Sequence, residues 1–362
     1  MYIPIMKNRN EETRVSKVCS SFFSDEVVPL FEIIQDKYIK RYEVDETGEY
    51  KYEIKPGNIK KSKIELIPKE EDIITLDEIN KNIEGKKAFI DFFRFFESEY
   101  GRNRNFKNIE TSILLSRNFN YYRSRILQIT KFKNFIPTIS IKKGLEISIY
   151  DLTILVNDIR KLGSSVALRI TADFLDTYLE FIEENLYSTD YVMLDIREDS
   201  MNSKIMEIED FETLNFSGKK ILLNSPRKRS MQNKEFGNLN FTTKIDNSVS
   251  EHYKDFHFDG FGDFGGLKDD LPTDIRSSRG AALALLFFKE YNKFYSIVNE
   301  DTSLGVSGYD YVKQEVIKRK NFFDPDNTCL GMAKIKELKK NGNFATWNNV
   351  NLTRYIQLQA SK

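Results

Sequence analysis

Short apolar runs recur along this chain, and a polar or charged residue follows each of them. The runs cover residues 2–6, 27–31, 88–90, 135–139, 166–168, 191–194, 221–223 and 258–262. Several are apolar at nearly every position, which is typical of strands buried on both faces, and segments with helical periodicity lie between most of them. This alternation predicts an α/β fold, a (β/α)8 TIM-like barrel of parallel strands and intervening helices.

Two segments depart from the alternation. Residues 35–71 are rich in Lys, Glu and Tyr and alternate in polarity, which predicts an inserted, solvated hairpin. Beyond residue 270 the pattern changes, and we expect a closing helix at 280–291 and then a C-terminal α+β addition. The predicted organisation is therefore a barrel with one insertion over residues 1–270 and an addition over residues 271–362.

Composition limits the partners of the protein. The 55 Lys and Arg residues equal the 55 Asp and Glu residues, so no global field attracts nucleic acid or an anionic membrane. Any recognition of an anion must be local, and nucleic-acid binding stays open. The first residues, MYIPIMKNR, contain no apolar stretch of signal-peptide length, so we expect no signal peptide, and no run approaches the roughly 20 residues of a membrane span. With only two distant cysteines, Cys19 and Cys329, we expect a cytoplasmic protein that does not bind membranes.

The residues that follow the runs form the main candidate site. In a (β/α)8 barrel the carboxyl ends of the strands converge on one mouth, so these side chains would share a cavity. They are Lys7, Glu32, Asp91, Arg169, Asp195, Asn224 and Asp263. Glu32, Asp91 and Asp195 could hold Mg²⁺ or Mn²⁺, because hard cations prefer oxygen ligands. These three and Lys7 are the candidate catalytic residues, since histidine is nearly absent.

The cations at the predicted mouth have two explanations. Lys7, Arg9 and Arg169 could clamp a phosphate or carboxylate group. Alternatively, Lys7 and Arg169 neutralise the three carboxylates in a buried ion network. Two further residues are candidates for ligand binding. Asn224 follows the seventh run, and Arg276 lies at the start of the predicted closing helix.

A glycine-rich stretch, HFDGFGDFGG, covers residues 257–266. Gly262, Asp263, Gly265 and Gly266 could present N–H groups to a phosphate, because glycine permits close approach of the backbone. A tight turn with aromatic packing explains the same residues equally well. The basic cluster at 226–229 follows the seventh run; such a cluster could bind a polyanion, but it is more often a solvated loop.

Three short motifs point to a known family: the opening YIPIMKNR at 2–9, PLFE at 29–32 and GFGDF at 260–264. Over roughly residues 1–300 the chain resembles the prokaryotic and phage "beta protein" family. The resemblance implies a barrel-like protein that is often encoded near genes for defence against phage, and hence a partner protein from such a system. By this resemblance, the matching positions are Lys7, Arg9, Glu32 and Asp263.

Two function classes stay open for this expected defence component. The first is an enzyme, a metal-assisted hydrolase of phosphate esters that acts on a nucleotide or nucleic acid at the barrel rim. The second is a non-catalytic sensor or a module that binds a partner protein. Carboxylates within reach of one metal ion favour the enzyme. Carboxylates that each pair with Lys or Arg, without an open cavity, favour the module.

Overall fold

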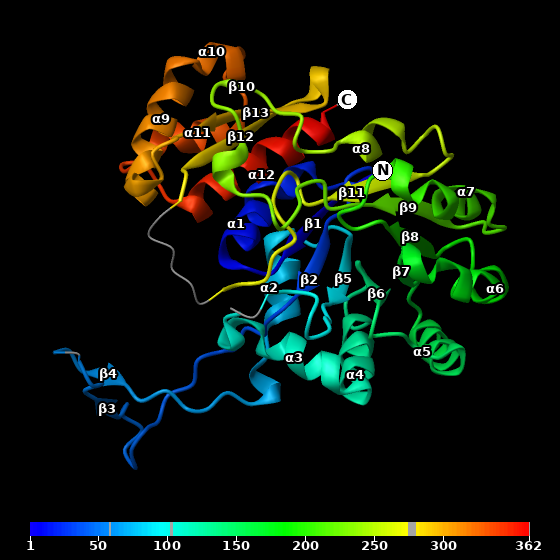
Figure 1. The fold of residues 1–362 in the computed structure, drawn as a ribbon. Coiled ribbons are helices and arrows are strands. Elements are labelled where there is room, and N and C mark those ends of the chain that lie inside the picture. The colour runs from blue at the N-terminus through cyan, green and yellow to red at the C-terminus, as the bar shows by residue number, and fades with distance from the viewer. Residues whose placement is uncertain (58, 102–103, 274–279, 362) are drawn as a thin grey trace.

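Eight strands form a closed barrel in this computed structural model, which describes residues 1–57, 59–101, 104–273 and 280–361. The barrel strands are β1 (Tyr2–Lys7), β2 (Leu30–Ile33), β5 (Ala88–Phe92), β6 (Phe135–Ile141), β7 (Ala167–Thr171), β8 (Tyr191–Asp195), β9 (Lys219–Leu223) and β11 (Gly260–Asp263). All neighbouring pairs are parallel, and β1 closes the ring by pairing with both β2 and β11 (Figure 1). The predicted (β/α)8 TIM-like barrel is confirmed.

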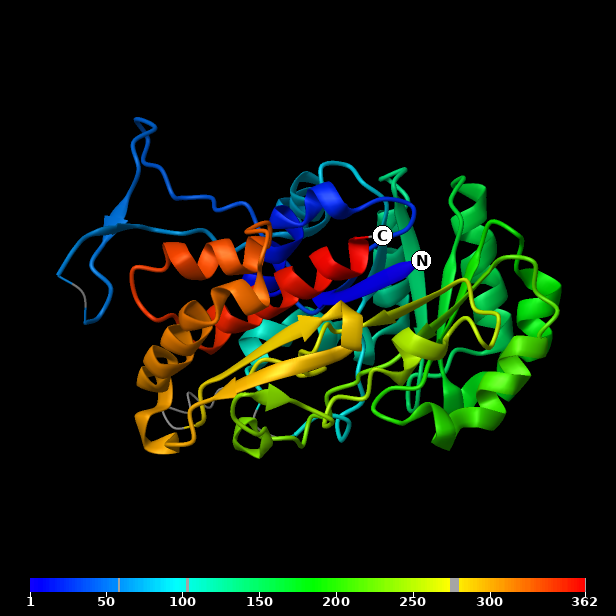
Figure 2. The same ribbon diagram turned by 90° about the horizontal axis from the view of Figure 1, so that it is seen from above.

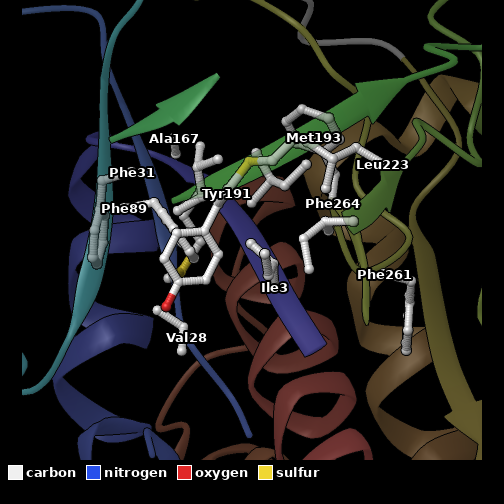
Figure 3. Packing of buried hydrophobic residues seen from close by; sticks show 14 of the residues in the cluster. Ile3, Val28, Phe31, Phe89, Ala167, Tyr191, Met193, Leu223, Phe261 and Phe264 are labelled. Carbon is white, nitrogen blue, oxygen red and sulfur yellow. The ribbon is translucent and has the colours of Figure 1, made fainter. Parts of the chain in front are cut away.

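The barrel strands are buried almost throughout, as their apolar sequences predict. Every residue of β1, β2, β5, β6, β8 and β11 is buried. Figure 3 shows side chains from several strands grouped together, among them Ile3, Met193 and Leu223. Because side chains cover one face of each strand and helices the other, the strands lack the polar alternation of a half-solvated sheet.

Helices connect the barrel strands and cover the outside of the barrel (Figure 1). They are α1 (Asn10–Val18), α2 (Thr75–Asn82), α3 (Glu110–Arg117), α4 (Phe119–Ile129), α5 (Ile149–Lys161), α6 (Leu175–Asn185), α7 (Ile205–Thr213) and α8 (Ser248–His252). In α5, Leu152, Val156 and Ile159 recur at helical spacing and are buried. None of the helices in the described ranges is both long and apolar enough to cross a membrane.

The last helix of the barrel comes from the C-terminus of the chain. Helix α12 (Phe344–Ala360) lies beside α1 and also contacts β1, as Figures 1 and 2 show. Its Leu352, Tyr355 and Ile356 belong to the same buried cluster as the barrel strands. Residues between β11 and α12 are therefore an insertion ahead of the eighth barrel helix.

The predicted closing helix at 280–291 is wrong, because this segment contains strand β12 (Leu283–Phe288). It pairs with β13 (Lys293–Val298), which in turn pairs with β10 (Asn240–Phe241). Alternate residues of this segment enter two separate cores: Leu283, Leu285 and Phe287 join the barrel core, whereas Ala284 and Leu286 join a second core. A strand buried on both faces is apolar at every position, so its periodicity resembles that of a buried helix.

The second core lies between this sheet and three further helices, α9 (Tyr309–Lys318), α10 (Lys320–Phe323) and α11 (Leu330–Glu337). Trp347 and Val350 of α12 also belong to it, so α12 contributes to both cores. The Trp347 ring stacks on Tyr309 at a centroid distance of 5.6 Å.

The predicted hairpin insertion is confirmed. Strands β3 (Tyr52–Glu53) and β4 (Ser62–Lys63) pair antiparallel. They belong to a segment that extends away from the barrel in both views (Figures 1 and 2). We call residues 36–57 and 59–72 the arm.

Candidate functional site

The residues predicted at the mouth of the barrel meet there in a buried ion network. Lys7 Nζ lies 2.5 Å from Glu32 Oε2. The Arg169 guanidinium lies 2.7 Å from both Glu32 Oε1 and Asp195 Oδ2, and 3.2 Å from Asp91 Oδ2. Each of these side chains is at most 4% exposed. The structural alternative, in which Lys7 and Arg169 neutralise the carboxylates, therefore describes this geometry.

Loop residues that the sequence did not indicate complete the network. Lys7 Nζ also lies 2.5 Å from Asp269 Oδ1, and Arg197 pairs with Asp269 at 2.6 Å and with Glu99 at 3.0 Å. Lys142 contacts Glu99 at 3.1 Å. We define the mouth network as Lys7, Glu32, Asp91, Glu99, Lys142, Arg169, Asp195, Arg197 and Asp269. Lys142 could have been found, because it lies two residues after Ser140 and strand side chains alternate.

Pairing decides the charge of most carboxylates in the network. Burial opposes ionisation, but Lys7 and Arg169 outweigh it and hold the pKa of Glu32 below its usual value. Against the same effect of burial, Arg169 and Arg197 lower the pKa of Asp195, and Lys7 and Arg197 lower that of Asp269. These three carboxylates are thus ionised at neutral pH.

Asp91 differs from the other carboxylates. Burial, together with the nearby charge of Glu32, raises its pKa despite Arg169. Its Oδ2 accepts a hydrogen bond from the Ser140 hydroxyl, while its Oδ1 has no hydrogen-bond partner in the described part of the chain. Among Glu32, Asp91, Asp195 and Asp269, Asp91 therefore has the least compensated charge.

Little free space remains inside the mouth. Asp91, Ser140, Lys142, Arg169 and Asp195 line a cavity of about 10 Å³. That volume is at the lower limit for one water molecule. A phosphate ester could enter only if the ion pairs separated.

The predicted metal ligands are arranged as acceptors of cationic side chains. Glu32, Asp91 and Asp195 all contact Arg169. Within the described ranges, no three His, Cys, Asp or Glu side chains are grouped as metal ligands. This donor set does not fit Mg²⁺ or Mn²⁺ as it is arranged, so the metal stays a prediction and we derive no step through it.

Asp263 lies at the end of β11 but turns away from the mouth network. Its Oδ2 accepts a hydrogen bond from Tyr355 at 2.7 Å, and its Oδ1 accepts one from Tyr2 at 3.3 Å. Burial raises the pKa of Asp263 to about 6. Asn224 is also buried, and among the described residues its side chain makes no hydrogen bond to the network. These two ligand candidates therefore lie outside the network.

The glycine-rich turn is covered by other parts of the protein. At Gly262, an added Cβ would lie 2.7 Å from the Ile3 oxygen, and at Gly265, where φ is +59°, it would lie 2.5 Å from Leu352. Gly266 faces the Phe294 ring in the same way. The Gly265 N–H donates to Asp263 Oδ1. This packing fits the tight-turn explanation, and phosphate binding by the turn stays a prediction; Arg276 lies outside the described residues.

A second, more open site lies at the rim, between the barrel and the C-terminal insertion. We call it the rim cleft; it measures about 180 Å³ and is lined by Arg9, Arg227, Asn233, Leu267, Lys268, Asp270, Leu283, Tyr309, Phe344, Asn348 and Asn351. Of these residues, Arg9 was predicted to bind ligand. Arg227 belongs to the basic cluster at 226–229, for which we favoured a solvated loop over a polyanion site.

Arg227 is buried rather than solvated, with 5% of its surface exposed. Its guanidinium donates to Asn233 Oδ1 at 2.7 Å and weakly to the Gly266 oxygen at 3.4 Å. In the part of the chain that the structure describes, its Nε has no partner and it forms no ion pair. Burial lowers the pKa of Arg227 to about 10, so the side chain still carries its charge at pH 7.

The other charged groups that line the rim cleft compensate the charge of Arg227 only in part. Arg9 is neutralised by its ion pair with Glu12. Lys268 Nζ donates to the Arg229 oxygen at 2.9 Å, and burial lowers its pKa. Asp270 is the one carboxylate among the described lining residues; burial raises its pKa, and its charge offsets those of Arg227 and Lys268 only in part, since burial still lowers the pKa of both. The rim cleft therefore has the electrostatics of an anion site.

A second pocket adjoins the rim cleft and shares Arg9, Leu267 and Asn348 with it. It measures about 270 Å³ and is largely apolar, with Val15 and Leu352 on its walls. The two volumes together reach the lower part of the ~300–1,000 Å³ range of small-molecule sites.

Comparisons with known proteins do not narrow the function. No family model matches this chain, and no curated protein is similar to it. The resemblance to the beta protein family and the expected role in defence therefore stay predictions.

The titration of Lys142 provides a test of the mouth network. Burial lowers the pKa of Lys142 to about 8 from 10.5. Between these two pH values the unfolded chain binds a proton that the folded chain does not, so the free energy of unfolding should rise with pH. Lys142→Met should remove this rise, which amounts to about 3 kcal/mol.

Urea denaturation between pH 7 and pH 11 measures this difference. Lys143→Met is the matched control, because Lys143 is the exposed neighbour in the sequence. If the free energies of unfolding of Lys142→Met and Lys143→Met depend on pH in the same way, burial does not lower the pKa of Lys142.

Proposed function

We propose that this protein binds a phosphate-bearing small molecule in the rim cleft. The observation that carries the proposal is the buried guanidinium of Arg227, which forms no ion pair with any residue in the described ranges. A buried charge without a counter-ion is costly, and an anion that reaches it recovers that cost. Phosphate suits this position because its oxygens accept the paired N–H groups of a guanidinium.

The adjoining pocket supports a ligand larger than phosphate itself. Its apolar walls at Val15, Leu267 and Leu352 suit a ring or another apolar group. The exposed amides of Asn10 and Asn348 lie at the same pocket and offer donors and acceptors. A nucleotide, with its phosphate on Arg227 and its base in the pocket, combines these features.

The mouth network has the features expected of a non-catalytic module rather than of a hydrolase. Its carboxylates face Lys or Arg, and its cavity is at the limit for one water molecule. We therefore favour a ligand sensor over a hydrolase of phosphate esters. A place for this sensor in phage defence, with a partner protein, rests on the family resemblance alone.

Calorimetric titration with inorganic phosphate and with AMP tests the proposal. We expect Arg227→Met to weaken the binding of both by at least tenfold, about 1.4 kcal/mol, because the charge-assisted contact is lost. Arg123→Met is the matched control, since Arg123 pairs with Asp158 on the outer helices and should leave affinity unchanged.

The stability of the ligand-free variant separates binding from misfolding. Arg227→Met should unfold no more readily than the wild type, because it removes a buried charge that forms no ion pair with the described residues while keeping a long side chain. Equal affinity in the wild type and Arg227→Met, or no binding by either, would refute the proposal. Release of phosphate from AMP in the presence of Mg²⁺ would instead support the hydrolase alternative.

A further inference from the structure

The arm exposes an unusual amount of apolar surface. Among the described residues, nine of the 22 large hydrophobic side chains that are exposed lie on it. They are Tyr38, Ile39, Val44, Tyr50, Tyr52, Ile54, Ile59, Leu66 and Ile67. Single exposed hydrophobic residues are ordinary, but a concentration on one protruding segment marks an interaction surface.

The segment from Tyr50 to Ile54 has one paired edge and one edge that no described residue pairs with, which we call the free edge. The Lys51 N–H donates to the Glu43 oxygen and the Lys51 oxygen accepts from the Ile64 N–H, both at 3.0 Å. The register of β3 and β4 continues this pattern at Glu53, opposite Ser62. Because backbone groups alternate in direction along an antiparallel strand, those of Tyr50, Tyr52 and Ile54 point to the other edge.

The sequence of this edge is complementary to itself. When two copies of YKYEI run antiparallel about Tyr52, Lys51 of one lies opposite Glu53 of the other, and Tyr50 lies opposite Ile54. Opposite charges and apolar pairs directly across an antiparallel ladder are stabilising. A parallel pairing in register would instead place Lys51 against Lys51, which is destabilising.

We propose that two copies of this chain associate through their arms, with the free edges paired antiparallel about a two-fold axis at Tyr52. In this two-fold arrangement the free edge of each copy pairs with that of the other, so no free edge remains and the assembly stops at a dimer. Figures 1 and 2 show that the arm extends away from the barrel, so we expect room beside it for a second copy. A contact limited to the arms is small, so we expect weak, concentration-dependent association.

Sedimentation of the full chain over a range from about 1 µM to about 100 µM tests the dimer. The wild type should shift from monomer towards dimer as its concentration rises. Glu53→Lys should keep the chain monomeric, since it brings a second positive charge against Lys51 of the other copy. The double variant Lys51→Glu/Glu53→Lys should restore the dimer, because it exchanges the two charges.

Two further variants exclude indirect effects. Glu46→Lys makes the same charge change on an exposed turn of the arm and should dimerise like the wild type. Tyr52→Pro removes the central N–H from the free edge and should abolish the dimer while the far-ultraviolet circular dichroism of the barrel stays the same. A wild type that remains monomeric throughout, or a dimer that survives both Glu53→Lys and Tyr52→Pro, would overturn the proposal.

Discussion

Arg169→Met is expected to lower the free energy of unfolding by about 3–5 kcal/mol at pH 7. Arg169 is the shared partner of Glu32, Asp91 and Asp195, all of which are at most 2% exposed. Removing one member of a buried network leaves the remaining charges in a medium that solvates them poorly. The loss should therefore far exceed the value of any single ion pair at the surface.

The dependence of this loss on pH identifies its cause. Without Arg169, the pKa values of Glu32 and Asp195 should rise, because burial then acts on them with less compensation. Protonation at lower pH relieves the cost, so the gap between wild type and variant should narrow from pH 7 to pH 4. Urea denaturation followed by circular dichroism measures both free energies.

Two controls sharpen the test of Arg169. Arg14→Met removes an exposed ion pair with Glu11 and should cost less than about 1 kcal/mol. Arg169→Lys keeps the charge but loses the fork that spans three carboxylates, so its loss should be intermediate. A loss for Arg169→Met as small as that of Arg14→Met, or one that does not change with pH, would contradict the network.

The sequence predicted the barrel because strand burial and helix periodicity are local signals. It also predicted that Lys7, Glu32, Asp91, Arg169 and Asp195 would meet, since strands of a parallel barrel end at one mouth. It could not decide whether they would bind a metal ion or one another. That outcome depends on distances between side chains from five different strands.

The residues that the sequence missed lie in loops. Arg197 and Asp269 follow β8 and β11 and reach the mouth through turns, with a positive φ of 56° at Arg197. No periodic pattern marks such positions. Arg227 was visible as part of a basic cluster, but its burial depends on the C-terminal insertion that covers it.

The role of α12 was also beyond the sequence. The unbroken apolar run at 283–288 is compatible with either a strand or a helix. The closing helix was therefore predicted about 60 residues too early. The true closing helix follows a second core, and the distance along the chain gives no sign that it returns to β1.

Tyr355→Ala is expected to cost about 3–5 kcal/mol and to destabilise the whole protein. Tyr355 is fully buried on α12, where its ring stacks on Phe294 at 5.4 Å and meets Phe287 edge-on at 4.5 Å. Its hydroxyl donates to Asp263 on β11. The side chain thus joins the last helix, the last barrel strand and the inserted sheet.

Tyr355→Phe measures the contribution of the hydroxyl group separately from that of the ring. It should cost about 1–3 kcal/mol at pH 7, because Asp263 loses its shortest hydrogen bond. The hydrogen bonds from Tyr355 and Tyr2 favour the ionised form of Asp263, whose pKa is about 6. Below that pH the carboxyl is protonated in the wild type as well, so the cost of Tyr355→Phe should shrink as the pH falls towards 5.

Trp347 allows the unfolding of the two cores to be compared, since it is the single tryptophan of the chain and lies in the second core. Because α12 enters both cores, fluorescence from Trp347 and circular dichroism from the barrel helices should report one coincident transition in the wild type. Tyr355→Ala should shift both signals by the same amount. Two separate transitions, with the barrel helices retained after Trp347 is exposed, would mean that the C-terminal segment is an independent addition and that the barrel closes without α12.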